Sequence, residues 1–72
     1  MKLRPGDILD LCGNYIIIEH CYILQEKYSY KYIYSPGYPT MVGLCSTAPQ
    51  NILENLEQIS PEMLDELKSG LL

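Results

Sequence analysis

The amino-acid sequence predicts a small α+β fold: four or five antiparallel strands curled into a partly open β-barrel, followed by two short C-terminal helices. The chain has 72 residues, a length that allows one domain over residues 1–72. Residues 5–45 are rich in Tyr, Ile and Cys and are divided by turn residues, which favours strands. Residues 49–70 are rich in Leu and Glu at helical spacing, which predicts an acidic helical tail packed on the sheet.

The first two strands are expected on either side of a glycine turn. Residues 5–7, Pro-Gly-Asp, have turn chemistry, and residues 8–12 form a short strand candidate before a second turn at residues 13–14. Residues 15–24 are β-branched and aromatic, and both their odd and their even positions are mainly apolar. Such a strand is either covered on both faces or bent so that its inner face changes along its length.

Two further strands are expected at residues 28–34 and 40–45. The polar residues 25–27 are the only break before the first of them, so a turn is expected there. Pro36 and Gly37 then predict a type II turn, because Pro and Gly favour its two central positions. A glycine inside the second range predicts a bulge or a close approach of another segment.

Two short helices are expected in the tail. Ser60 and Pro61 predict the cap and the first residue of the second helix, and Lys68 and Gly70 predict its end. Neither helix is long enough to be stable alone in water, so both must dock on something. The two apolar stripes are Ile52, Leu53, Leu56 and Ile59 in the first helix, and Met63, Leu64, Leu67 and Leu71 in the second.

The expected core draws on both parts of the chain. A core is marginal at this length, and apolar side chains are expected on both faces of the sheet. We therefore expect a homodimer or a constitutive complex. The predicted core residues are Ile8, Leu11, Ile16, Ile18, Ile23, Ile33, Val42, Leu44, Leu56, Leu64 and Leu67.

The strand count and turn spacing of residues 5–45 resemble, in outline, the Src-homology-3-like barrels and the KOW-type barrels of transcription factors. This resemblance implies a small barrel. The chain lacks the glycine-centred signature of the KOW motif and the acidic, Trp-bearing groove of signalling barrels. The resemblance therefore implies no functional residues.

The net charge of −4 falls entirely within residues 49–72. The chain has no cluster of Lys and Arg of the kind that attracts a phosphate backbone, so a nucleic-acid partner is not expected. No apolar run approaches the roughly 20 residues that span a bilayer, and no signal-peptide segment follows the first residues. An odd number of cysteines is not a disulfide framework. These features predict a cytoplasmic protein without membrane attachment.

No enzyme is predicted, and neither a cofactor nor a metal ion. Cys12, His20, Cys21 and Cys45 lack the paired spacing of zinc ligands, and adjacent residues of a strand point to opposite faces. Cys21 or Cys45 with His20 provides the residue types of Cys–His catalysis, but no oxyanion loop is evident. The thiols are expected to behave as small apolar side chains.

Two groups of residues are candidates for partner binding. Four alternating tyrosines at positions 28, 30, 32 and 34 are expected to share one face of their strand. This row offers contact area at low entropy cost and could stack bases, or it could instead supply the inner face of the sheet. The acidic tail could keep the protein soluble, dock a basic partner, or imitate the charge of a nucleic acid. The candidates are Tyr28, Tyr30, Tyr32, Tyr34 and Tyr38, and Glu54, Glu57, Glu62, Asp65 and Glu66.

The sequence therefore predicts a small non-enzymatic protein-interaction module: an accessory subunit, adaptor or inhibitor of a larger protein. It would bind through an apolar and tyrosine surface together with the acidic helical face. The alternative is a small nucleic-acid-binding barrel that uses the ladder from Tyr28 to Tyr34 with Lys27 and Lys31. Thiol or metal chemistry is the third class of function considered.

Overall fold

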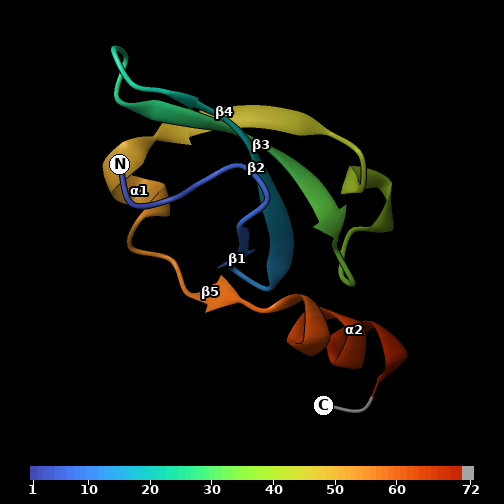
Figure 1. Ribbon diagram of the computed structural model, residues 1–72. Coiled ribbons are helices and arrows are strands. Elements are labelled where there is room, and N and C mark those ends of the chain that lie inside the picture. Colours follow the sequence, from blue (N-terminus) through green and yellow to red (C-terminus); the bar gives the residue numbers. More distant parts are fainter. Residues whose placement is uncertain (71–72) are drawn as a thin grey trace.

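The computed structural model describes residues 1–70, which form an open five-stranded antiparallel sheet in the order β4-β3-β2-β1-β5 (Figure 1). This arrangement confirms the predicted α+β class. Within the described residues, no pairing of the two edge strands β4 and β5 closes the sheet into a barrel. The strands are β1 Ile8–Leu11, β2 Asn14–Tyr22, β3 Lys27–Tyr34, β4 Cys45–Pro49 and β5 Gln58–Ile59. The helices are η1 Pro39–Met41, α1 Gln50–Leu53 and α2 Pro61–Ser69.

β1 and β2 are joined by a two-residue turn at Cys12 and Gly13, one residue earlier than expected. Both residues have positive φ angles, 54° and 86°, as the central residues of a type I′ hairpin turn do. Asn14 already pairs with Leu11 in the ladder. The side chain of Asp10 supports the turn, because its Oδ1 accepts a hydrogen bond of 2.9 Å from the backbone N–H of Gly13.

A bulge at Glu19 explains why β2 is apolar at both odd and even positions. Ile18 pairs with Tyr30 and His20 pairs with Ser29, so the register shifts between them. The face that carries Ile18 at one end of the strand therefore carries Cys21 at the other. β2 is also covered on both sides by apolar side chains, so both alternatives that the sequence left open hold together.

A second bulge separates Tyr34 from the other tyrosines of β3. Tyr15 pairs with Tyr34, whereas the next residue, Ile16, pairs with Tyr32. The prediction that four tyrosines share one face is therefore wrong for Tyr34, because strict alternation assumes a strand without a bulge. The ring of Tyr34 stacks on that of Tyr15 instead, with 5.9 Å between centroids and 22° between planes.

The two faces of the sheet carry two separate cores. The first lies between the sheet, α1 and the N-terminal segment, and the second lies beneath α2. Each short helix packs on one face of the sheet, where α1 contributes Leu53 to the first core and α2 contributes Leu64 to the second. The first core contains Leu3, Leu9, Ile16, Ile18, Tyr28, Tyr30 and Leu53. The second contains Ile8, Ile59 and Leu64, with Tyr15, Ile17, Ile33 and Tyr34 packed against it.

The predicted strand at residues 40–45 is wrong. Residues 39–41 form η1, and the chain then turns at Gly43, whose φ is 94°. The N–H of Leu44 donates to the carbonyl of Met41 at 3.0 Å, which closes this turn, and β4 begins at Cys45. Val42 and Leu44, which were expected in the core, are 48% and 55% exposed, because they belong to the turn.

The expected type II turn at Pro36 and Gly37 has another geometry. The N–H of Tyr38 donates to the carbonyl of Ser35 at 3.0 Å, so a turn is present. Gly37 does not have the positive φ that a type II turn requires at its third residue. The turn expected at residues 25–27 lies earlier in the chain, over residues 23–26, since β3 begins at Lys27.

The two predicted helices have different outcomes. α1 is a single turn, and Ile59, expected on its apolar stripe, pairs with Ile8 as part of β5. α2 begins and ends as predicted: the side chain of Ser60 accepts from the N–H of Met63, and Gly70 follows with a φ of 77°. Leu71, the last member of its predicted stripe, lies outside the described residues. Over residues 1–70, every helix is too short and too polar to cross a membrane.

Candidate functional site

The tyrosines of β3 contribute mainly to the first core. Tyr28 is completely buried and Tyr30 is 7% exposed, so neither ring is available to a partner or a nucleobase. Tyr32 and Tyr34 are half-buried. Tyr38, on the segment between β3 and β4, is 63% exposed, so this tyrosine candidate is accessible to a partner. In a chain without Phe or Trp, tyrosines fill the core positions of large aromatic residues.

Glu54 is held by the fold. The hydroxyl of Tyr28 donates to Oε2 of Glu54 at 2.5 Å, and the backbone N–H of Lys2 donates to the same oxygen at 3.0 Å. The hydrogen bond from Tyr28, followed by that from Lys2, holds the pKa of Glu54 below its ordinary value. Burial, followed by the hydrogen bond to Glu54, raises the pKa of the Tyr28 hydroxyl. Glu54 therefore joins α1 to the N-terminal segment.

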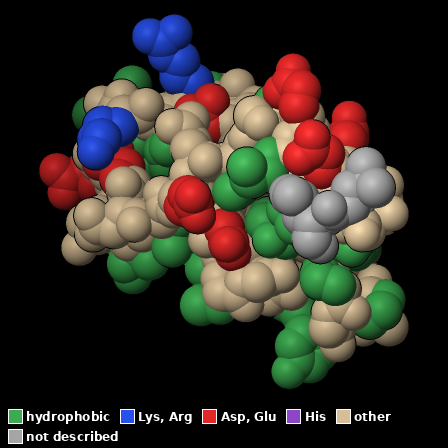
Figure 2. Space-filling model, turned by 90° about the horizontal axis from the view of Figure 1, so that it is seen from below, with side chains coloured by type: hydrophobic (Ala, Val, Ile, Leu, Met, Phe, Trp, Pro, Cys, Tyr) green, Lys and Arg blue, Asp and Glu red, His purple; other side chains and the backbone are tan. Residues whose placement is uncertain are grey.

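The other four acidic candidates are exposed. Figure 2 shows acidic side chains spread over the face seen from below, with Lys and Arg confined to its margin. α2 itself presents three carboxylates and one exposed apolar side chain, Met63, while Leu64 is buried against the sheet. Three of the four exposed carboxylates therefore lie on an ordered, capped helix, and the fourth, Glu57, directly precedes β5. The exposed candidates are Glu57, Glu62, Asp65 and Glu66.

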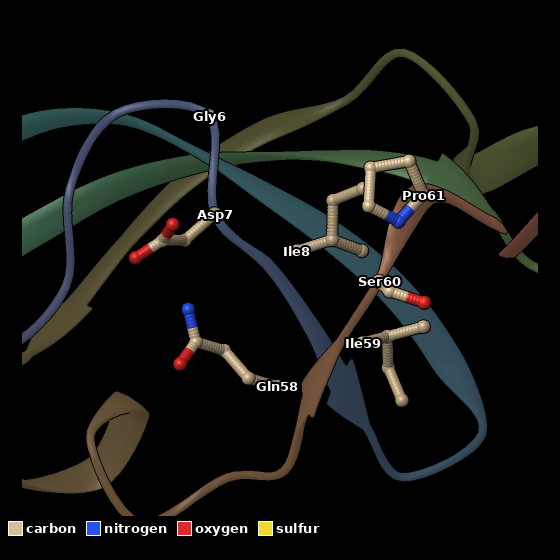
Figure 3. A pocket seen from close by; sticks show the side chains of 7 residues that line it. All are labelled: Gly6, Asp7, Ile8, Gln58, Ile59, Ser60 and Pro61. Atoms are coloured by element: carbon tan, nitrogen blue, oxygen red, sulfur yellow. The ribbon is translucent and has the colours of Figure 1, made fainter. Parts of the chain in front are cut away.

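A groove of about 380 Å³ lies between the turn that precedes β1 and the segment that joins β5 to α2 (Figure 3). The side chains of Asp7 and Gln58 point toward one another across it. Oδ2 of Asp7 accepts from the N–H of Arg4 at 2.9 Å, and Oγ of Ser60 is used to cap α2. The groove offers one carboxylate and one amide for hydrogen bonding. Its lining is Gly6, Asp7, Ile8, Gln58, Ile59, Ser60 and Pro61.

The cysteines and the histidine are dispersed. Sγ of Cys21 lies 3.5 Å from the carbonyl of Leu3, and Cys12 is exposed in its turn. A hydrogen bond to the carboxylate of Glu19 raises the pKa of the Cys45 thiol, which lowers its thiolate fraction at neutral pH. Over residues 1–70, no three His, Cys, Asp or Glu side chains are placed to hold one metal ion.

Exposed apolar side chains occur in two turns and, apart from Tyr38, were not predicted. Ile23 and Leu24, at the tip of the β2–β3 hairpin, are 71% and 96% exposed. The second group, Tyr38, Val42 and Leu44, lies between β3 and β4. Sequence reasoning missed Ile23, Leu24, Val42 and Leu44 because it assigned them to strands, whereas Tyr38 was already a candidate in a predicted turn. Grouped apolar exposure of this kind is typical of interaction surfaces.

The accessible surface thus combines an acidic helix with exposed apolar turns. The side chains of Asp7 and Ser60 near the groove, and of Glu54 beside the first core, already form hydrogen bonds within the chain. Comparison with known protein families, with curated proteins and with solved structures found no match.

Proposed function

We propose that the protein is a small non-enzymatic interaction module, an accessory subunit, adaptor or inhibitor, that binds a basic surface of a larger protein. The acidic face of α2 would make the polar contacts, and the exposed group Tyr38, Val42 and Leu44 would make apolar ones. One observation carries the proposal: α2 is capped at both ends, buries only Leu64, and leaves its carboxylates and Met63 outside. A preformed helix loses little conformational entropy on binding.

The charge distribution supports a basic partner. All of the net charge of −4 lies in residues 49–72, and the exposed carboxylates of α2 are Glu62, Asp65 and Glu66. Complementary charge accelerates encounter and specifies orientation, and salt weakens it over a Debye length of about 8–10 Å. We therefore expect binding that is fastest at low ionic strength.

The non-enzymatic part of the proposal is supported by how the reactive groups are used. Glu54 accepts a hydrogen bond from the hydroxyl of Tyr28, and the side chain of Ser60 caps α2. The carboxylate of Glu19 raises the pKa of the Cys45 thiol. Three free thiols, two of them exposed, are typical of a reducing compartment, which supports the expected cytoplasmic location.

The experiment is affinity capture from the native host with two matched double variants. Asp65→Asn with Glu66→Gln removes two charges from α2, whereas Glu19→Gln with Glu26→Gln removes two charges from the sheet and hairpin. We expect the α2 variant to recover much less of the partner at low salt, and the control to recover it as the wild type does. Equal recovery by both variants would contradict the proposal.

A second pair of variants tests the apolar contacts. Val42→Ser with Leu44→Ser should weaken capture in both low and high salt, because apolar contacts are not screened by ions. Ile23→Ser with Leu24→Ser removes equally exposed apolar side chains at the hairpin tip and should leave capture unchanged. Loss of capture only in the variant with Ile23→Ser and Leu24→Ser would show that the apolar contacts are made by the β2–β3 hairpin and not by the segment between β3 and β4.

A further inference from the structure

The outer edge of β4 is an open strand edge with little protection. β4, Cys45–Pro49, pairs with β3 on one side, and among residues 1–70 no strand pairs with its other side (Figure 1). It contains no charged residue, and its first three side chains are exposed. Soluble proteins usually protect such edges with charges, bulges or prolines, because an open edge is a template for another strand. Here a proline stands only at the last position.

The ladder shows which backbone groups of β4 face outward. The N–H of Tyr32 donates to the carbonyl of Leu44 at 2.9 Å, and the N–H of Gln50 donates to the carbonyl of Glu26 at 2.8 Å. Hydrogen-bonded positions alternate along an antiparallel strand, so the even-numbered residues of β4 face β3. Cys45, Thr47 and Pro49 consequently direct their backbone groups away from the sheet.

We propose that this edge pairs with β4 of a second copy of the chain, antiparallel, about a twofold axis at Thr47. In this register the strands overlap along their full length. Each Thr47 N–H donates to the carbonyl of Thr47 in the other copy, and each Cys45 N–H donates to the carbonyl of Pro49. Every outward donor of β4 then has an acceptor, and the N–H that Pro49 lacks is required only at the outer end.

Two properties of β4 and one of Leu44, the residue that precedes it, favour a second copy as the occupant. Its outward donors and acceptors are complementary to themselves in the twofold arrangement, and an uncharged strand pairs with itself without opposing like charges. Leu44 lies opposite Tyr32, whose ring packs on the first core, so it is on the face that α1 covers. The register places Leu44 beside the start of α1 in the other copy, where Ile52 is 52% exposed.

Oligomeric state tests the pairing, measured by sedimentation velocity over a range of concentrations. Thr47→Pro removes an N–H that β3 does not use, so we expect a monomer with the far-ultraviolet circular dichroism of the wild type. Losing two central hydrogen bonds should weaken the dimer by about tenfold or more. Thr47→Val keeps the N–H and a similar shape, and should remain dimeric. A wild type that is monomeric at high micromolar concentration overturns the proposal.

Thr47→Lys tests the same pairing of β4 with β4 if Thr47→Pro does not fold. It places two ammonium groups opposite each other at the axis, so the dimer should dissociate at low salt and recover partly at high salt. A dimer that is unaffected by Thr47→Lys overturns the pairing. Leu44 is shared by the pairing and by the proposed apolar contacts, so the α2 charge variants separate the two proposals. A monomer that still captures a basic partner through Asp65 and Glu66 removes self-pairing alone.

Disulfide trapping tests the register, in a background that carries Cys12→Ser and Cys45→Ser. Opposed residues in a hydrogen-bonded antiparallel pair have Cα atoms about 5.5 Å apart, within the range of a disulfide. Thr47→Cys should therefore cross-link under mild oxidation. Ser46→Cys is the matched control, because position 46 lies opposite position 48 in this register and should not cross-link. Cross-linking through position 46, or through neither position, overturns the twofold axis at Thr47.

Discussion

The hydroxyl of Tyr28 donates a hydrogen bond of 2.5 Å to Glu54, which lies 26 residues later in the chain. The same hydroxyl accepts from the N–H of Leu3 at 3.1 Å, and Glu54 accepts from the N–H of Lys2. A buried tyrosine thus holds both the N-terminal segment and the short α1 against one face of the sheet. Since α1 is a single turn and is too short to be stable alone, these hydrogen bonds contribute to its stability.

Replacing Tyr28 with Phe should lower the free energy of unfolding by about 1–3 kcal/mol, because the Leu3 N–H loses its buried acceptor and Glu54 loses a donor. Urea titration followed by circular dichroism measures this change. Tyr22→Phe is the matched control, since Tyr22 is 39% exposed, and its effect should stay within about 0.5 kcal/mol. Equal effects of the two variants would mean that the hydroxyl of Tyr28 contributes nothing to stability.

The lowered pKa of Glu54 predicts a loss of stability in acid. The folded state binds this proton less tightly than the unfolded chain, whose pKa is near the ordinary 4.5. The contribution of Glu54 to stability is therefore complete above pH 4.5 and declines as the pH falls through the lowered pKa of the folded state. Glu54→Gln should show a shallower loss than the wild type over this window in urea titrations at several pH values. Parallel curves for the two proteins would contradict the prediction.

Signals that act within a few residues predicted local structure well. Ser60, Pro61 and Gly70 placed both ends of α2, because capping depends on the backbone groups of one helical turn. The turn between β1 and β2 was expected at residues 13–14 but is centred on Cys12 and Gly13. A glycine in the sequence marks a turn without showing whether it is the first or the second central residue. Signals from neighbouring residues thus predicted that these elements exist, but they did not always predict the residues at which the elements begin and end.

Features that depend on distant pairing could not be predicted. The bulge that separates Tyr34 from Tyr32 arises from the register of β2 against β3, and Ile59 leaves its expected helix because Ile8 offers a strand partner. Among the candidate site residues, Tyr28 is buried, which agrees with the alternative that the tyrosines supply the inner face of the sheet. The exposure of Leu24 at the hairpin tip was not predicted, because a turn without glycine gives no strong signal in the sequence.

The contrast between Leu9 and Leu24 tests the division between core and surface. Leu9 is completely buried in the first core, so Leu9→Ala should destabilise the protein by about 2–5 kcal/mol. Leu24 is 96% exposed, so Leu24→Ala should change stability by no more than about 0.5 kcal/mol. Thermal and urea unfolding measure both variants. A large loss of stability in Leu24→Ala would show that the hairpin tip is covered in solution.

The cap of α2 should be measurable because this helix has only nine residues. Oγ of Ser60 accepts from the N–H of Met63 at 3.1 Å, and Ser60→Ala should cost about 1 kcal/mol. Ser60→Asp retains a capping oxygen and adds a negative charge at the positive end of the helix dipole, so it should keep the stability of the wild type. Equal losses in both variants would show that capping does not account for the effect.

Cys12 occupies a position that suits another residue better. Its φ of 54° lies in the left-handed region, where a side chain such as Asn is tolerated and a thiol gains nothing. Cys12→Asn creates the Asn-Gly pair favoured in type I′ turns and should raise the free energy of unfolding by about 0.5–1 kcal/mol. Cys12→Val, whose β-branch resists a positive φ, should lower the free energy instead. Thermal unfolding of the three proteins should rank Asn above Cys and Cys above Val, and a reversed order would contradict the turn geometry.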